Sequence, residues 1–281
     1  MNKEEFDSFF KIHSQNVDNA DRQGFWGLTD KVLETYLLEL MPRRDSVTLV
    51  DFGGGTGRWL KKLDAKFTNS KFIIVDLSED MLFQAKKKVE KGYFANEITL
   101  MHSDISDIKD LNDGTADYII STYNPLSFVK EPQKAINEAH RLLKPGGIAM
   151  ITIQGYYNAL YSKLNNSVAE ADELKSIFEE KKVKWNESVP ALWQLPQSDL
   201  QNMFKMSGFN EIECRGIATV IQPQSEDFDP ENILIGSISR KLNEDEAFFN
   251  VVLEIELNAG KDQQAINRAM NILAIGRKKA K

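Results

Sequence analysis

The sequence lacks several features that are typical of particular classes of protein. It contains one cysteine, Cys214, so an internal disulfide is excluded and a reducing compartment is the natural setting. No apolar run approaches the length of a membrane span, and the charged start, MNKEEFDSFF, lacks the apolar segment of a signal peptide. We therefore expect a cytoplasmic protein without a membrane partner.

Net positive charge is also missing. The formal charge of −7 disfavours a nucleic-acid partner, because binding to phosphate backbones normally depends on a basic face. Three histidines, His13, His102 and His140, show no metal-ligand spacing, so no metal site is predicted. Repeats and linkers rich in Gly, Pro or Ser are absent as well. A length of 281 residues then indicates one large domain with additions, or at most two domains.

What the chain does have is a glycine-rich loop in the stretch VTLVDFGGGTGRWL. A short apolar run ends at Asp51, four glycines follow within five residues, and RWLKKL reads as the start of a helix. Such glycines permit positive φ and let a ligand approach free backbone amides at the helix N-terminus. The spacing is D-x-G-x-G-x-G. It is not the dinucleotide fingerprint, because Arg58 occupies the position of the third glycine, and no Walker sequence exists.

A second acid follows at the end of the next apolar run, FIIVDLSEDML. Asp76 lies about 20 residues past the glycine loop, where a doubly wound sheet places a carboxylate on ribose hydroxyls. A carboxylate suits that role because it accepts hydrogen bonds from both hydroxyls of one ribose. The alternative role for Asp76 is that of a cap for the next helix, but Ser78 fits that role better.

Further apolar runs deliver polar residues to the same predicted edge. ITLMHSDISDI ends with Ser103, Asp104 and Ile105, and ADYIISTYNPLSFV has a strand that ends at Ser121 and Thr122. In EAHRLLKPGGIAMITI a helix stops before a Gly-Gly turn and a fifth strand begins. Strands and helices thus alternate, which is typical of an α/β fold with a parallel sheet.

These motifs together resemble the class I S-adenosylmethionine (SAM) dependent methyltransferases. VDFGGGTG is similar to the first motif of that family, DLSEDML to the second, and LLKPGG to its helix-to-strand turn. The resemblance implies a doubly wound, seven-stranded, mostly parallel sheet with helices on both faces and an antiparallel last strand. It also implies SAM as cofactor, S-adenosylhomocysteine as product, and cofactor-binding roles for Asp51, Gly53, Gly55, Gly57, Asp76, Leu77, Met81, Asp104, Ile105 and Ser121.

The same resemblance divides the chain into four parts. These are an N-terminal helical cap (1–46), the SAM-binding core (47–153), a substrate lid insertion (154–197) and the C-terminal part of the sheet (198–281). In the last part we expect a helix capped by Ser198 and ending at Gly208, a sixth strand from Glu211 to Ile221, a helix in NEDEAFFNVVLEIEL and a last strand in AMNILAIGRKK.

Residues just after the fourth strand lie closest to the reacting methyl in this family, which makes Tyr123 and Asn124 the catalytic candidates. NPLSF is similar to the N-P-P-[FY] motif of amino-methylating nucleic-acid enzymes, but the second proline is missing. His102 is a structural or a catalytic residue, and His140 is a surface or packing residue. Since the chain has only three histidines and none lies in a persuasive position for a general base, we expect an acceptor that is already ionised or a neutral nucleophile, such as a carboxylate or an amine.

Aromatic residues outside the core are candidates for the acceptor site. Phe25 and Trp26 either cover the site or fasten their helix to the core, and Tyr156, Tyr157, Trp185 and Trp193 form either a substrate wall or plain core. The predicted activity is O- or N-methylation of a small molecule or short peptide, and homodimer formation is left open. The alternatives are an RNA or protein methyltransferase, a catalytically silent SAM-binding module and a nicotinamide-dependent oxidoreductase.

Overall fold

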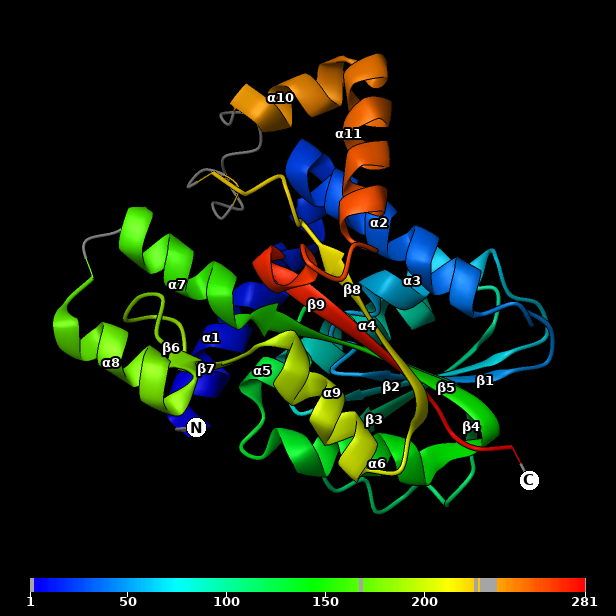
Figure 1. Cartoon of the computed structure of the whole chain (residues 1–281). Coiled ribbons are helices and arrows are strands. Elements are labelled where there is room, and N and C mark those ends of the chain that lie inside the picture. The colour runs from blue at the N-terminus through cyan, green and yellow to red at the C-terminus, as the bar shows by residue number, and fades with distance from the viewer. Residues whose placement is uncertain (1–2, 167–168, 225–226, 228–236, 281) are drawn as a thin grey trace.

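The computed structural model describes residues 3–166, 169–224, 227 and 237–280 (Figure 1). The helices in this part of the chain are α1 (Lys3–Asn16), α2 (Gly24–Leu40), α3 (Arg58–Asp64), α4 (Glu79–Glu90), α5 (Pro125–Phe128), α6 (Pro132–Leu142), α7 (Tyr156–Asn165), α8 (Ala171–Glu180), α9 (Gln197–Met206), α10 (Ser237–Glu244) and α11 (Glu246–Ala259), with the 3-10 turns η1 (Val17–Arg22) and η3 (Ile266–Arg268). The strands are β1 (Thr48–Phe52), β2 (Lys71–Asp76), β3 (Glu97–His102), β4 (Ala116–Ser121), β5 (Leu143–Gly155), β6 (Lys182–Val183), β7 (Leu192–Leu195), β8 (Asn210–Ile217) and β9 (Asn271–Arg277).

The sheet has the predicted doubly wound topology. Parallel strands run in the order β3-β2-β1-β4-β5, and β9 pairs antiparallel with both β5 and β8. The last strand of the chain is therefore inserted antiparallel between its neighbours, which confirms the predicted fold class. The strand order reverses between β1 and β4, and in open α/β sheets the crevice at such a reversal is where ligands bind.

The predicted count of seven strands is wrong, because the described residues form a nine-stranded sheet. The two extra strands, β6 and β7, arise in the expected lid insertion. β7 pairs parallel with the end of β5 at Gln154 and Gly155, and β6 pairs antiparallel with β7. Both are shorter than the strands of the core, so neither has enough alternating residues to stand out in the sequence.

Two predicted boundaries in the C-terminal part differ from the structure. β8 ends at Ile217 rather than Ile221, because Ala218 has a φ of +53° and the next three backbone amides leave the ladder. These amides, of residues 219–221, donate to the buried carboxylate of Glu256 over 2.6 to 2.9 Å. Helix α9 begins at Gln197 with Pro196 as its N-cap, so Ser198 lies inside the helix and is not the cap.

Each face of the sheet is covered by helices, as the alternation of its strands requires. Val50 and Phe52 of β1 pack on the face that α6 and α9 cover, whereas Leu49 packs on the opposite face under α2, α3 and α4 (Figure 1). All three side chains are almost completely buried. Their burial between two helical layers holds β1 in place. It therefore also sets the position of the glycine loop, which begins directly after β1.

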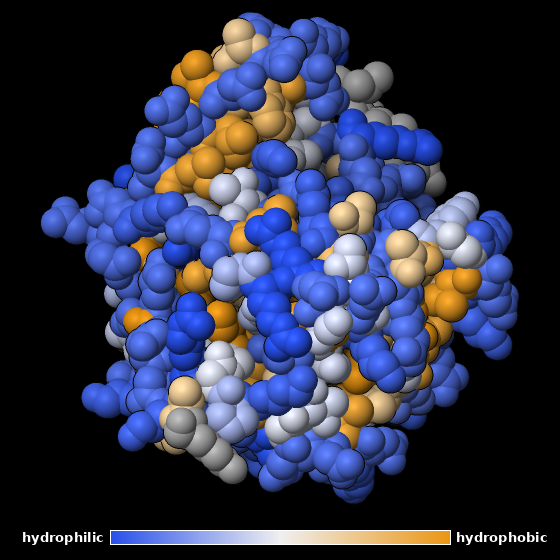
Figure 2. All heavy atoms as spheres, turned by 90° about the vertical axis from the view of Figure 1, so that its right-hand side faces the viewer, coloured by the Kyte–Doolittle hydropathy of each residue, from blue (hydrophilic) through white to orange (hydrophobic). Residues whose placement is uncertain are grey.

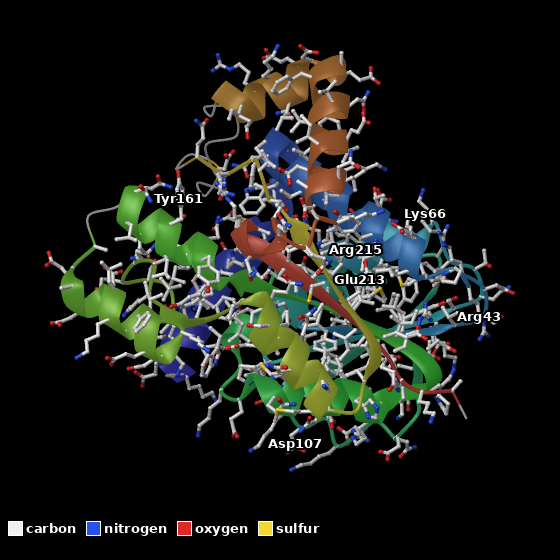
Figure 3. All side chains as sticks on the ribbon, in the orientation of Figure 1. Arg43, Lys66, Asp107, Tyr161, Glu213 and Arg215 are labelled. Atoms are coloured by element: carbon white, nitrogen blue, oxygen red, sulfur yellow. The ribbon has the colours of Figure 1, made fainter. Side chains whose placement is uncertain are left out.

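The C-terminal segments are fastened to α2. Arg215 of β8 contacts Glu213 (2.6 Å) and Glu39 of α2 (2.9 Å), and Figure 3 shows Arg215 beside Glu213. The helices α10 and α11 lie above α2, and Figure 2 shows apolar side chains gathered over this upper region of an otherwise mostly hydrophilic face. Beside Arg215, Cys214 is buried, and burial raises the pKa of its thiol to about 12.

None of the helices that the structure describes is both long enough and apolar enough to cross a membrane.

Candidate functional site

A large cavity opens at the strand-order reversal between β1 and β4. Its volume is about 1370 Å³, and its walls come from α1 and η1, the glycine loop, the ends of β2 and β4, the lid segment and residues 222–227 where the structure describes them. Of the ten residues predicted to bind a cofactor, seven line this cavity: Gly53, Gly55, Asp76, Leu77, Met81, Asp104 and Ile105. Segments far apart in the sequence thus meet at one site, as the topology predicts.

The glycine loop needs its glycines for shape. Gly53, Gly55 and Gly57 have φ values of +67°, +54° and +73°. A Cβ atom at Gly53 would lie 2.3 Å from the Cβ atom of Pro125, which is far too close. Four loop amides are bonded within the protein: those of Gly53 and Gly54 donate to Val75 O, that of Gly55 to Asp76 Oδ2, and that of Gly57 to Gly54 O. These four amides are therefore not free for a ligand, and the glycines that carry them offer it space.

Asp76 connects the glycine loop to the start of α4. Its Oδ2 accepts from the backbone N–H of Gly55 and its Oδ1 from that of Ser78, both at 2.8 Å. Burial raises the pKa of Asp76 to about 6, and these hydrogen bonds act in the opposite direction. The carboxylate is thus charged at neutral pH, faces the cavity and keeps lone pairs for further donors. As expected, Ser78 caps α4, because its hydroxyl oxygen accepts from Met81 N.

Asp51, Gly57 and Ser121 are not among the described residues that line the cavity. Asp51 is completely buried beneath the loop, and neither of its carboxylate oxygens has a hydrogen-bond partner among the described residues. Burial, with a smaller contribution from Asp76, raises its pKa to about 8. The Ser121 hydroxyl donates to Phe52 O over 2.9 Å. Asp51 and Ser121 thus lie beneath the loop, and Gly57 is the loop residue that forms the N-cap of α3.

Tyr123 and Asn124 both have positive φ, +56° and +70°, and both line the cavity. The Tyr123 hydroxyl donates to Asp30 and lies 3.0 Å from the hydroxyl of Thr29, so it fastens the turn after β4 to α2. Burial, followed by the charge of Asp30, raises the pKa of Tyr123 well above its usual value. The phenol is therefore neutral at ordinary pH and unsuited to accept a proton.

Asp30 belongs to an ionic cluster whose Arg58 lines the cavity. Arg58 contacts Asp30 and also Asp21, whose Oδ1 lies 2.6 Å from Nη2 of Arg58. Lys62 contacts the same two carboxylates at 2.7 and 3.2 Å. Burial opposes the charge of Arg58, but Asp30 and Asp21 outweigh it and the pKa of Arg58 is raised. The cluster binds η1 and α2 to α3.

Only some of the predicted substrate aromatics reach the cavity. Trp26 and Trp185 line it, whereas Phe25 is fully buried against Leu28 and Leu242. Tyr156, Tyr157 and Trp193 are also not among the described lining residues. Tyr156 is buried in a cluster of the lid, Tyr157 is exposed, and Trp193 donates to Val129 O over 3.0 Å.

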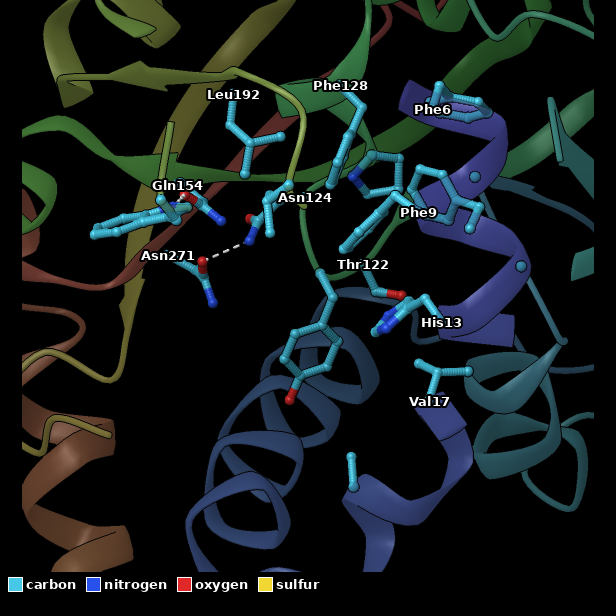
Figure 4. A pocket seen from close by; sticks show the side chains of 18 of the residues that line it. Phe6, Phe9, His13, Val17, Thr122, Asn124, Phe128, Gln154, Leu192 and Asn271 are labelled. Carbon is cyan, nitrogen blue, oxygen red and sulfur yellow. Dashed lines mark hydrogen bonds between the residues drawn. The ribbon is translucent and has the colours of Figure 1, made fainter. Parts of the chain in front are cut away.

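The cavity also has an aromatic wall that the sequence analysis missed. It consists of Phe6, Phe9, Phe10 and His13 of α1 together with Phe128, all of which line the cavity. The rings of Phe9 and His13 are stacked with centroids 5.3 Å apart, and Phe10 meets Phe128 edge to face at 5.1 Å (Figure 4). The signal was present in FDSFFKIH, whose aromatic residues recur at helical spacing.

His13 is the histidine that the structure places at the site. Its ring nitrogens make no hydrogen bond within the part of the chain that the structure describes, and burial lowers its pKa, so the imidazole is neutral at pH 7. His102 is half exposed, with Nε2 2.9 Å from Leu77 O, and His140 packs edge to face on Phe209. Sequence reasoning undervalued His13 because nothing local indicated that α1 folds over the sheet edge.

Comparisons with known proteins show what the chain is similar to. Residues 49–147 match the family model described as a methyltransferase domain. The chain is 24% identical over 249 residues to the ubiquinone/menaquinone biosynthesis C-methyltransferase UbiE of Ruegeria sp. (strain TM1040), covering 87% of this chain and 78% of that protein.

The same comparison finds the UbiE protein of Paracoccus denitrificans (strain Pd 1222), 26% identical over 125 residues, which are 44% of this chain and 49% of that protein. The chain thus spans about half the length of this relative. Among solved structures, the putative methyltransferase in complex with the Trm112 activator of Haloferax volcanii aligns with a TM-score of 0.57 and 15% identity, over 96% of this chain and 97% of that one. The resemblance to the class I SAM-dependent methyltransferases is thus confirmed for the core, where residues 49–147 match a methyltransferase domain, and for the fold, which the solved structures share.

Proposed function

We propose that this protein binds SAM between the glycine loop and Asp76 and transfers its methyl group to a small molecule. The observation that carries the proposal is the continuity of the cavity. One space of about 1370 Å³ reaches from Gly55 and Asp76 to the aromatic wall on α1. Pockets for one drug-sized ligand measure roughly 300 to 1000 Å³, so this cavity has room for a cofactor and an acceptor side by side.

The residues present fit SAM. A Cβ atom at Gly55 would lie 3.5 Å from Met81 Sδ and 3.9 Å from Asp76 Oδ2, so glycine leaves the space between loop and acid open. The charged Asp76 would accept hydrogen bonds from the ribose hydroxyls. Buried Ile105, beside the exposed Asp104, would pack against the adenine. When bound, the cofactor supplies an electrophilic methyl group, and the protein's tasks are to align an acceptor and to remove a proton where needed.

The proposed acceptor carries an apolar or ring-shaped portion, because the aromatic wall offers rings for it to pack against. Relatives named for ubiquinone and menaquinone biosynthesis support this class, and since they are named as C-methyltransferases, carbon joins oxygen and nitrogen as a candidate acceptor atom. His13 would take the proton released by a hydroxyl acceptor at a ring nitrogen. A short peptide acceptor and a homodimer stay predictions. Transfer of the label from methyl-labelled SAM to an acceptor would distinguish an enzyme from a catalytically silent SAM-binding module.

Binding of S-adenosylhomocysteine tests the proposal. Calorimetry is expected to give a dissociation constant in the micromolar range for the unaltered protein. Asp76→Ala is expected to weaken it at least tenfold, about 1.4 kcal/mol, because the ribose loses its carboxylate. Asp107→Ala serves as a control, since Asp107 is an exposed acid at the surface and is not among the described residues that line the cavity (Figure 3).

NADH, as a second ligand, is expected not to bind. Absence of S-adenosylhomocysteine binding to the unaltered protein would refute the proposed function. Equal binding by Asp76→Ala would show that the cofactor lies elsewhere in the cavity.

A further inference from the structure

Opposite the aromatic wall, the cavity presents a group of side-chain amides. We call Asn124, Gln154 and Asn271 the amide cluster. They come from the turn after β4, from β5 and from β9, and all three line the cavity (Figure 4). The topology brings them together although Asn124 and Asn271 are 147 residues apart in the sequence.

A hydrogen bond between Asn124 and Asn271 orients these two members of the cluster. Nδ2 of Asn124 donates to Oδ1 of Asn271 over 2.7 Å, and the backbone N–H of Asn124 donates to the hydroxyl of Thr152 over 2.9 Å. Asn124 is 5% exposed and Asn271 is 2% exposed. The bond uses the amide oxygen of Asn271, so its Nδ2 is left as a donor. Conversely, Oδ1 of Asn124 is a buried acceptor with no partner among the described residues.

Gln154 is oriented in the same way. Its Oε1 accepts from Nε1 of Trp185 over 3.1 Å and from Nε2 of Gln194 over 2.5 Å. With the oxygen fixed by two donors, Nε2 of Gln154 is left as a donor to the cavity, and it makes no hydrogen bond to any residue that the structure describes. The amide cluster thus holds two N–H donors and one oxygen acceptor in set orientations.

The side chains that bond to the amide cluster carry no charge. Neighbouring lining residues are also amides: Gln194 bonds to Gln154, and Asn158 donates to Gln222 over 2.7 Å. Two charged lining residues have partners within the protein: the ammonium group of Lys163 pairs with Glu173 and donates to Lys184 O, and the carboxylate of Asp227 accepts from Ser239 and from the backbone N–H of Gln224. A charged ligand group buried here would lose hydration without gaining a counter-charge, whereas a hydroxyl or carbonyl group loses far less.

We propose that the amide cluster binds the hydroxyl or carbonyl oxygens of an uncharged, ring-bearing acceptor, whose apolar portion packs on the aromatic wall. An unpaired buried amide oxygen is unfavourable, and a hydroxyl donor from the acceptor would give the Asn124 oxygen a partner. The inference rests on the proposed function and deepens it. It favours a neutral phenol-like acceptor over the carboxylate or amine that the scarcity of histidines suggested.

Three probes with the same ring test the inference: 2-naphthol, 2-naphthoate and 2-naphthylmethylammonium. Each is titrated into protein saturated with S-adenosylhomocysteine, and binding is measured by calorimetry. We expect 2-naphthol to bind at least tenfold more tightly than either charged probe. Comparable or tighter binding of a charged probe, or no binding of any probe, would overturn the inference. Failure of S-adenosylhomocysteine itself to bind would instead refute the proposed function.

A change of charge at one member of the amide cluster sharpens the test. Gln154→Glu keeps an oxygen for Trp185 and Gln194 but replaces the free donor by a negative oxygen. We expect 2-naphthol affinity to fall at least fivefold and 2-naphthylmethylammonium affinity to rise, with S-adenosylhomocysteine affinity unchanged. Gln264→Glu, at an exposed loop position, is the matched control and is expected to change none of these affinities.

A second variant guards against a loss of folding. Asn271→Asp likewise keeps the oxygen that Asn124 needs and removes the donor, so the same shift between probes is expected. Thermal unfolding and S-adenosylhomocysteine binding establish that each variant is folded. A folded variant of either kind with unchanged 2-naphthol affinity would contradict the assignment of the amide cluster.

Discussion

Asp51→Asn is expected to stabilise the folded protein, by an amount that grows as the pH rises from about 5 to about 8. Asp51 is completely buried in β1, neither carboxylate oxygen has a hydrogen-bond partner among the described residues, and its pKa is raised to about 8 by burial and secondarily by Asp76. In the unfolded chain an aspartate has a pKa near 4. Between these two values the unfolded state releases a proton that the folded state keeps.

The sign follows from this difference in proton binding. Below about pH 4 both states are protonated, and the contribution of Asp51 to stability is fully present. As the pH rises toward 8, each unit costs the folded state up to about 1.4 kcal/mol, so the total reaches a few kcal/mol. Asparagine has nearly the same shape as aspartate but does not titrate, so the free energy of unfolding of the variant does not show this fall.

Urea unfolding at several pH values measures the effect as the difference in free energy of unfolding between variant and unaltered protein. Asp245→Asn is the control, because Asp245 caps α11 and its pKa is lowered by Lys241. The stabilisation that Asp245 provides is lost only in acid. The difference in free energy of unfolding between Asp245→Asn and the unaltered protein should therefore be constant from pH 5 to pH 8. A constant difference for Asp51→Asn over the same range would contradict the raised pKa.

Arg58→Met is expected to lower the free energy of unfolding by about 3 kcal/mol. Removal of one partner of a buried ion pair typically costs about 3 to 5 kcal/mol, because the other charge stays buried without compensation. The side chains of Arg58 and Asp30 are 9% and 6% exposed. We expect the lower end of the range, since Lys62 still contacts Asp30 at 3.2 Å.

The double variant Arg58→Met/Asp30→Asn separates the buried charge from the lost packing. It is expected to be more stable than Arg58→Met alone, because no uncompensated carboxylate is left at position 30. Lys71→Ala removes an exposed pair with Glu97 and is expected to cost less than about 1 kcal/mol. A loss of that small size for Arg58→Met would mean that the cluster adds little to stability.

The parts of the site that the sequence predicted are those encoded locally. The glycine loop and Asp76 lie on a strand end and a turn whose residues are neighbours in the chain, and both contribute to the cavity. Asp51 was correctly placed at the strand end, but whether it faces the cavity or the space beneath the loop depends on how Gly54 packs on it. That contact has no signature in a linear pattern.

The acceptor end could not be predicted in the same way, because distant pairings build it. In β7, alternate residues face opposite sides, so Leu192 and Gln194 line the cavity whereas Trp193 turns away to Val129. The sequence alone favours the aromatic Trp193 as the cavity residue, because the pairing of β7 with β5 that turns Gln194 to the cavity is not visible in it. Asn271 was not predicted to be a site residue, because nothing near it in the chain indicates its contact with Asn124.

The burial of Cys214 has a practical consequence for following the protein in solution. A thiol whose pKa is raised to about 12 and whose side chain is 1% exposed reacts very slowly with alkylating dyes. A cysteine introduced at Ile12, which is 65% exposed on α1, would then be the sole fast-reacting thiol, without any need to remove the native one. A fluorophore attached there would report directly on whether the helix that carries the aromatic wall moves when ligands enter and leave.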